Sequence, residues 1–159
     1  MKYLRIASII LLVLWMILIF SLSAQTAAES SGTSGRLITM IIRIIHSDFD
    51  SLSDAEQFQI VESFQFIVRK AAHFTAYAIL GIFSFFTYIT YIKIPFKYRL
   101  LLITATCLLY SISDEIHQTF IPGRSGEVRD VCIDFCGSLL SIALLYAITK
   151  KAKYRKYIE

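Results

Sequence analysis

The chain has 159 residues, of which 56% are apolar and only 18% are charged, and its mean hydropathy is +0.62. About a quarter of the residues in a soluble domain are charged, and a disordered chain is far less apolar, so both classes are excluded. Three cysteines are too few for a small disulfide-stabilised secreted scaffold. Six glycines and two prolines favour long uninterrupted helices, so the composition predicts an all-α membrane protein.

Four stretches are long and apolar enough to cross a bilayer, whose hydrocarbon core takes about 20 helical residues. They cover residues about 6–24, 70–92, 100–121 and 130–149, within a single domain over residues 1–159. The first could instead be a signal peptide, because a basic start and an apolar stretch precede small residues. No cleavage site stands out there, so a retained span is favoured.

The longest segment between predicted spans covers residues about 25–68. Its serines and glycines at 30–35 are typical of a flexible linker. Residues 37–45 are apolar but too few to span, which predicts a short amphipathic helix on the membrane surface. From Ser53, a capping-box pattern and apolar residues at helical spacing predict a second helix that leads into the second span.

The basic residues are distributed unevenly between the two sides of the predicted membrane. The two termini and the link after the second span, which four spans place on one side, hold ten Lys and Arg residues and one acid. The other side holds six Lys and Arg residues and eleven acids. Lys and Arg concentrate in cytoplasmic loops, so both termini are predicted to be cytoplasmic, in a bacterial cytoplasmic membrane. The pI of about 9.0 therefore reflects topology beside anionic headgroups, and no nucleic-acid partner is expected.

Polar and charged residues gather at the predicted outer ends of three spans. In chain order they are Arg69, Lys70, His73, Tyr77, Ser111, Asp114, Glu115, His117, Gln118, Arg124, Arg129, Asp130 and Asp134. Residues three or four apart share a helix face, and the acids lie at similar depths, which predicts one outward-opening pocket. An acid near the centre of a membrane helix costs on the order of 2.5–3.5 kcal/mol. The acids should therefore face the bundle interior and pair with the lysine and arginines nearby.

A purely structural role is the alternative, since polar contacts between membrane helices are common and contribute about 0.6 kcal/mol each. It deserves weight for Tyr77, Ser111 and Gln118. It fits eight formal charges and two histidines poorly, because apolar residues often replace buried ion pairs without loss of stability. Ionisable residues inside a span mark functional sites by default, so a functional pocket is favoured.

Four motifs, in this order, resemble the VanZ-like family. They are SLSAQ at 21–25, RKAAHFTAY at 69–77, SDEIHQ at 113–118, and PGR at 122–124 followed by Asp130-Val131. The resemblance covers most of the chain and implies a small bacterial integral membrane protein. Its best-known member is associated with low-level resistance to teicoplanin.

The family's signature positions follow from the same motifs. By resemblance they are Lys70, His73, Tyr77, Asp114, Glu115, Gln118, Arg124 and Asp130. The family pattern usually has Asn where this chain has Asp134, and Gly where it has Ser141.

Recognition of an anionic ligand is the first functional hypothesis. Arg69, Lys70 and Arg124 suit a phosphate or carboxylate, to which Arg offers two parallel hydrogen bonds. The remaining signature residues would complete this ligand-binding site. The expected partners are membrane lipids and a lipid-linked cell-wall precursor or a glycopeptide.

Catalysis is the second hypothesis, with His73, Asp114 and His117 as candidate acid–base residues of a transferase or hydrolase acting on a lipid-linked phosphate or acyl group. The sequence contains no serine elbow, HExxH or phosphate loop, so the enzyme interpretation is not favoured. Proton-coupled transport through the buried acids ranks third, because four spans show no inverted repeat.

No metal or other cofactor is expected. A ligand set could be assembled from Cys132, Cys136, the two histidines and the acids, but no CxxC or HxxxH spacing supports it. Together with Cys107, these cysteines are more typical of small packing residues.

Overall fold

The computed structural model describes residues 2–91 and 93–155 and contains only helices and turns within them. The helices are α1 (Lys2–Ser23), α2 (Ala27–Ile45), the 3-10 turn η1 (Phe49–Ser51), α3 (Asp54–Tyr91), α4 (Phe96–Gln118) and α5 (Val128–Arg155). The predicted all-α class is confirmed, and α1, α3, α4 and α5 are long and apolar enough to cross a membrane. Residues 119–121, assigned above to the third span, form a turn after α4.

Some residues used in the predictions fall outside this description. Ile92, at the predicted end of the second span, and Lys156 and Glu159 of the basic tail are outside the described residues. The side chains of Lys2, Arg5, Lys153 and Arg155 are likewise not described.

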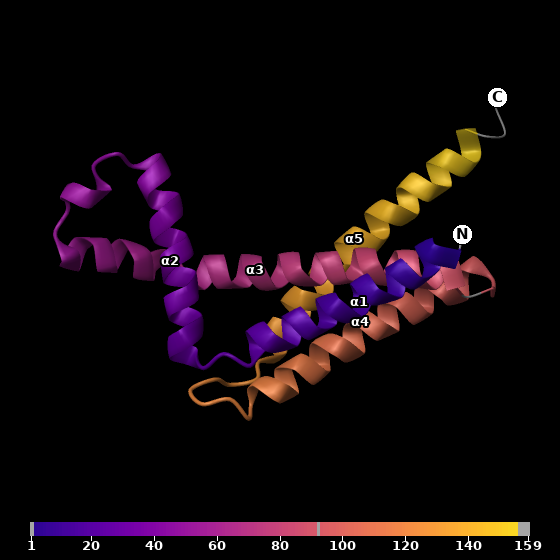
Figure 1. Cartoon of the computed structure of the whole chain (residues 1–159), viewed down its shortest axis with the longest axis horizontal. Helices are drawn as coiled ribbons and strands as arrows, with labels where there is room; N and C mark the ends of the chain where they lie inside the picture. The colour runs from indigo at the N-terminus through magenta and orange to yellow at the C-terminus, as the bar shows by residue number, and fades with distance from the viewer. Residues whose placement is uncertain (1, 92, 156–159) are drawn as a thin grey trace.

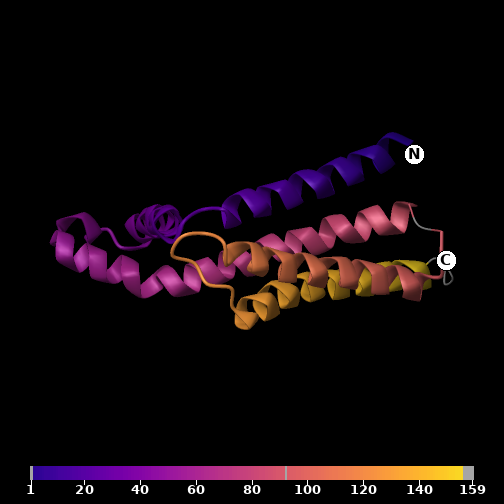
Figure 2. The same ribbon diagram turned by 90° about the horizontal axis from the view of Figure 1, so that it is seen from below.

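Helix α3 is the axis of the molecule (Figure 1). Helices α1 and α4 run along its C-terminal part, and α5 crosses it there before its own C-terminal part diverges (Figure 1). The N-terminal part of α3 projects beyond these helices and is crossed by α2 (Figures 1 and 2). The start of α1 and the C-terminal end of α3 lie at the same end of the bundle (Figure 2). This is expected if α1 and α3 each cross the membrane once, in opposite directions. The cytoplasmic location of this end stays a prediction from the Lys and Arg distribution.

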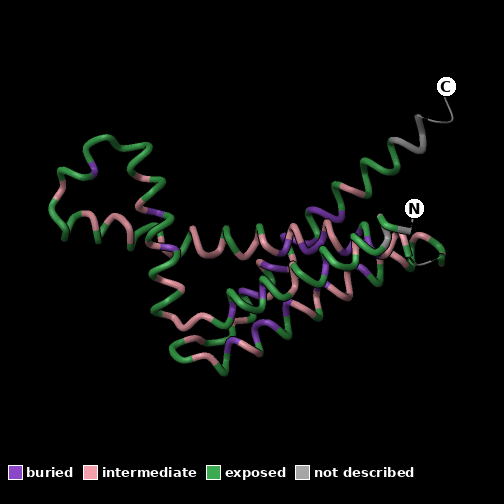
Figure 3. Tube along the Cα trace, viewed as in Figure 1, coloured by how far each residue is buried: buried purple, intermediate pink, exposed green. Residues whose placement is uncertain are grey.

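The buried core is narrow and lies where the long helices meet (Figure 3). Leu80, Ile103 and Cys107 are completely buried there. Large apolar side chains on the outer faces are instead exposed, including Leu101 and Leu109 at more than 60%. An apolar exterior around a small interior is what a lipid solvent permits, because lipid tails compete with the core for apolar side chains.

Small residues bring α3 and α5 into close contact. A Cβ atom built on Gly137 would collide with the backbone carbonyl of Phe74, and one on Gly81 would collide with the hydroxyl of Ser141. Ser138 donates a hydrogen bond from its Oγ to the carbonyl of Tyr77 at 3.0 Å. Close backbone approach through glycine and serine is typical of packed membrane helices, and it places the polar residues of α3 beside those of α5.

The prediction of a flexible linker at residues 30–35 is wrong, because these residues lie within α2. A capping box starts this helix: Glu29 N donates to Thr26 Oγ1, and the Glu29 carboxylate accepts from Thr26 N at 2.8 Å. Ser34 then donates from its Oγ to Gln65 Oε1 of α3 at 2.9 Å. Capping and this contact outweigh the low helix propensity of the serines and glycines.

The two helices expected after the first span are confirmed as helices. Residues 37–45 form the second half of α2, with Ile38 buried and Met40, Ile44 and Ile45 exposed. The capping box at Ser53 starts α3, which continues without a break to Tyr91. The location of α2 on a membrane surface stays a prediction.

Acid should weaken the start of α2. Two hydrogen bonds from Thr26 lower the pKa of Glu29 below its usual value of 4.5, so its carboxylate stabilises the fold fully above that value. This stabilisation is lost as the pH falls through the lowered pKa. We expect the unmodified protein to resist unfolding better than Glu29→Gln at pH 7, and the difference to shrink as the pH falls below 4.5 and through the lowered pKa. A difference in denaturation midpoint that stays constant over this range would contradict the capping role.

Candidate functional site

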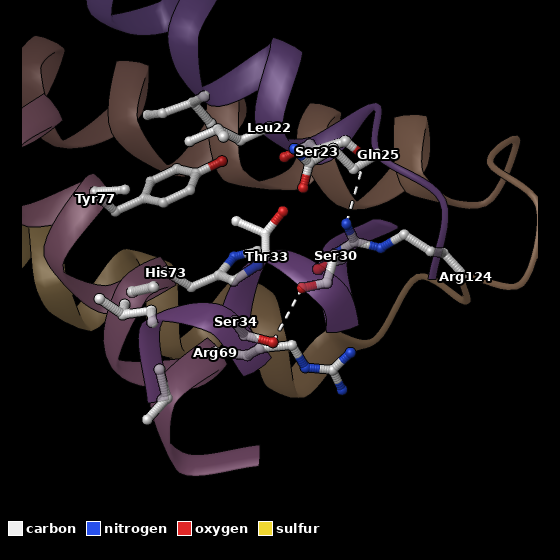
Figure 4. A pocket seen from close by; sticks show the side chains of 15 residues that line it. Leu22, Ser23, Gln25, Ser30, Thr33, Ser34, Arg69, His73, Tyr77 and Arg124 are labelled. Atoms are coloured by element: carbon white, nitrogen blue, oxygen red, sulfur yellow. Dashed lines mark hydrogen bonds between the residues drawn. The ribbon is translucent and has the colours of Figure 1, made fainter. Parts of the chain in front are cut away.

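A cavity of about 370 Å³ opens between the C-terminal end of α1, α2 and the middle of α3 (Figure 4). Its apolar walls include Ile19, Leu22, Leu37, Val68, Ala72 and Ala76. Its polar residues are Ser23, Gln25, Ser30, Thr33, Ser34, Arg69, His73, Tyr77 and Arg124. The cavity therefore combines an apolar wall with a cluster of polar and cationic groups.

Helix α3 contributes one polar side chain to the cavity on each of three successive turns. Arg69, His73 and Tyr77 all line it, which confirms that their spacing of four residues puts them on one face. Figure 4 shows the hydroxyl of Tyr77 pointing into the cavity on the same side as His73. The three residues offer a guanidinium, an imidazole and a phenol to a common space.

Lys70 leaves this face and forms an ion pair with α5. Its Nζ lies 2.5 and 2.6 Å from the two carboxylate oxygens of Asp130, and both side chains are largely buried. The pair lines a second, smaller pocket of about 110 Å³ that shares Arg69, His73 and Arg124 with the first. The charge of Lys70 is thus already compensated within the protein.

A tight turn aims Arg124 back at the bundle. Gly123 has φ of +75°, a conformation that residues with a side chain rarely adopt. The carbonyl of Pro122 accepts a hydrogen bond from Ala27 N at 3.3 Å, which holds this turn against the start of α2. The Pro-Gly-Arg motif is therefore explained by geometry: the turn returns the arginine to the cavity rim.

Gln118 connects the turn to the acids of α4. It accepts from Arg124 Nη2 at 2.5 Å and donates from Nε2 to Glu115 Oε1 at 2.9 Å and to Asp114 Oδ2 at 3.3 Å. Ser23 Oγ, at the end of α1, donates to the same oxygen of Asp114 at 2.9 Å. This neutral amide lies between the guanidinium and the two carboxylates, so α1, α4 and the turn are joined without a direct ion pair.

The expected pairing of the acids with basic side chains is correct only in part. Asp130 pairs with Lys70 as predicted, but among the described residues no Lys or Arg lies within ion-pair distance of Asp114 or Glu115. Glu115 instead accepts from the backbone N of Glu127 at 2.9 Å. Hydrogen bonds therefore reach both oxygens of Glu115, whereas those of Asp114 reach Oδ2 only.

Asp134 is fully buried and faces α3. Its Oδ1 lies 3.4 Å from His73 Nδ1, so its partner is a histidine and not the predicted arginine. Arg129 pairs with Glu127 at 2.6 Å on the surface. The α3–α5 contact through Gly137, one helical turn further along, sets the depth at which Asp134 meets His73.

Of the three candidate acid–base residues, the structure brings two together. His73 and Asp114 belong to one cluster, described below, whereas His117 stacks on Phe20 with ring centroids 4.2 Å apart. His117 lines neither of the two pockets described above, and within residues 2–91 and 93–155 it forms no ion pair with Asp114. The two residues are three apart on one helix, but the imidazole turns toward α1.

One group of side chains has the composition of a metal site. Single donor atoms of His73, Asp114, Glu115 and Asp134 all lie within 4.8 Å of one another. The cysteines do not join them: Cys107 is buried in the core, and Cys132 and Cys136 are exposed on α5.

The sequence analysis missed the contribution of α2 to the site. Ser30, Thr33 and Ser34 line the cavity, although their segment was predicted to be a linker. The Thr26–Glu29 spacing, which is a capping-box signature, was the signal that would have predicted a helix here.

Fold and site together define a class: an all-helical membrane protein whose apolar helices hold, at one end, a cavity lined by partly buried basic groups. Residues 8–149, nearly the whole chain, match the family model described as VanZ/LLP1. The chain belongs to the VanZ/LLP1 family, which confirms the resemblance of its four motifs. No curated protein and no solved structure matches it.

Proposed function

We propose that the cavity binds the anionic headgroup of a membrane lipid or of a lipid-linked cell-envelope precursor. The observation that carries this proposal is an uncompensated positive charge. Arg69 and Arg124 line the cavity, and neither has a carboxylate within 4 Å among the described residues. Lys70 and Arg129, at the same end of the bundle, are both neutralised by acids.

The shape of the cavity supports an amphiphilic ligand. Its volume of about 370 Å³ is in the range of small-molecule sites, and it is bounded by apolar residues of α1, α2 and α3. A headgroup and the first part of a chain would fit, with the rest of the chain in the bilayer. Guanidinium groups bind phosphate through paired charge-assisted hydrogen bonds, so phosphate is the favoured anion.

Matched lipids test this proposal directly. Geranylgeranyl phosphate and geranylgeraniol share one tail and differ only in the phosphate, so their binding to the purified full chain isolates the headgroup. We expect the phosphate to bind at least tenfold more tightly, and less tightly at high salt, because the rim charges are partly exposed to screening. Equal affinity for the two lipids, measured by native mass spectrometry, would refute headgroup recognition.

The family connection extends the proposal to the cell envelope. We infer that occupancy of this site alters the lipid-linked precursors available at the cell surface and so reduces susceptibility to teicoplanin. Membership in the VanZ/LLP1 family supports this, since a VanZ-like protein is the resistance-associated member in the resemblance above. The cytoplasmic membrane, with both termini inside, is the proposed location.

A hydrolase or transferase acting on the same ligand is the second candidate. The observation that favours it is the His73–Asp134 pair, since a histidine beside a carboxylate is a common general base, and His73 lines the cavity next to Arg69. Release of inorganic phosphate from geranylgeranyl phosphate would separate turnover from binding alone.

A further inference from the structure

Two helices direct acidic side chains at one point beside His73, which lies on α3. Asp114 and Glu115 come from α4, and Asp134 comes from α5. All three acids are buried, with relative exposures of 3%, 4% and 0%. Among the described residues, none of these three acids forms an ion pair with a lysine or an arginine. The cluster therefore concentrates acidic groups where water has little access.

The hydrogen bonds of the described chain leave oxygens of Asp114 and Asp134 without a donor, although they reach both oxygens of Glu115. Both oxygens of Asp134 and Oδ1 of Asp114 are buried and accept no hydrogen bond there, and Asp134 Oδ1 lies 3.4 Å from the imidazole Nδ1 of His73. A buried carboxylate oxygen without a donor costs about 1–3 kcal/mol or more. Asp134 is thus fully buried, has His73 as its neighbour but accepts no hydrogen bond from it, and lies beside the other donors of the cluster.

The donor atoms lie close enough together to bind one metal ion between them. One donor from each of the four side chains lies within 4.8 Å of the others. Donors on opposite sides of an octahedral ion with bonds of about 2.1 Å are about 4.2 Å apart, and neighbouring donors are closer. Small rotations of the side chains would therefore bring all four within bonding distance.

We propose that His73, Asp114, Glu115 and Asp134 bind one divalent transition-metal ion. One imidazole and three carboxylates form a mixed nitrogen and oxygen set, which suits Mn²⁺ or Zn²⁺ better than a purely carboxylate set would. Two positive charges at this point would compensate the acids and bind the buried oxygens of Asp134 and Asp114 that accept no hydrogen bond.

The ion would be reachable from the cavity. His73 lines both pockets, so the cluster lies directly behind the cavity wall. The helices bury the acids from the other directions, which leaves the His73 side as the entry path. This proposal concerns the binding of the ion alone, and its test uses no lipid, so it stands or falls separately from the proposed headgroup recognition.

The experiment measures the binding of Mn²⁺, as the probe, to the full chain in detergent. After treatment with a chelator and its removal, we expect the protein to bind one Mn²⁺ per chain, read from the loss of the free Mn²⁺ electron paramagnetic resonance signal. Zn²⁺ should displace it, because Zn²⁺ binds such donors more tightly than Mn²⁺ does. Absence of saturable binding would overturn the proposal and would mean that protons alone compensate the acids.

Isosteric variants locate the ion. Asp134→Asn and Asp114→Asn should each lower Mn²⁺ affinity at least tenfold, whereas Glu62→Gln, an exposed acid on α3, should not change it. Unchanged affinity in both aspartate variants would show an adventitious ion on surface acids. Circular dichroism and gel filtration establish that each variant is folded.

A spectroscopic signature covers the case in which the aspartate variants do not fold. Bound Mn²⁺ should show a ¹⁴N coupling from an imidazole in the unmodified protein, and His46→Gln and His117→Gln should retain it. A bound ion without that coupling, or one whose coupling disappears in either control, would place the ion elsewhere and overturn the assignment.

Discussion

Replacing both Arg69 and Arg124 with alanine should reduce binding of a phosphate-headed lipid by more than 100-fold. Hydrogen bonds to charged groups contribute about 1.5–3 kcal/mol each, so the loss of one such contact per arginine amounts to about 3 kcal/mol or more. A difference of 3 kcal/mol corresponds to a factor of about 150 in the dissociation constant. Neither guanidinium has an acid partner among the described side chains, so their removal leaves no unpaired carboxylate behind.

Two paired arginines provide matched controls. Arg129 is bound to Glu127 and Arg43 to Asp50, and both side chains are more than half exposed. Alanine at either position should leave affinity for geranylgeranyl phosphate within about twofold, because surface ion pairs contribute little. Loss of affinity in Arg129→Ala comparable to that in the double variant would mean that general positive charge, and not the cavity, attracts the lipid.

The same variants can be tested in cells. Strains that lack the protein, express it, or express Arg69→Ala/Arg124→Ala at equal membrane levels should differ in teicoplanin susceptibility, with only the unmodified protein being protective. Equal susceptibility of all strains would refute the inferred effect on teicoplanin while leaving lipid binding to be judged from the binding measurements.

Gly137→Ala should destabilise the protein substantially, although it adds a single methyl group. That methyl would overlap the carbonyl of Phe74, which is backbone and cannot rotate away. Helices α3 and α5 would have to separate, and His73 and Lys70 would lose their contacts with the acids of α5. Overpacking of this kind typically costs about 1–3 kcal/mol, to be measured as a lower free energy of unfolding in detergent.

Gly32→Ala is the matched control for this substitution. A Cβ there meets nothing within 4 Å, and alanine is favoured over glycine in a helix by up to about 1 kcal/mol. We expect Gly32→Ala to be neutral or stabilising. If both variants unfold at the same denaturant concentration as the unmodified protein, the close approach of α3 to α5 is not required for the fold.

The sequence by itself determined the class of protein and the faces of its helices. Long uncharged stretches identify membrane helices because the cost of charge in lipid is a local property of each segment. The shared face of Arg69, His73 and Tyr77 likewise follows from helix geometry alone. Which residues share a face of one helix can be predicted from their spacing, without knowledge of any other helix.

Only the tertiary structure decided which side chains meet across helices. The partner of Asp134 is His73 and not an arginine, and His117 turns toward Phe20, although both histidines were candidate acid–base residues from the sequence. These outcomes depend on the rotation and depth of each helix relative to its neighbours, which small residues such as Gly137 set through backbone contact. The α2 wall of the cavity was missed for a related reason, since its contact with Gln65 joins segments that are distant in the chain.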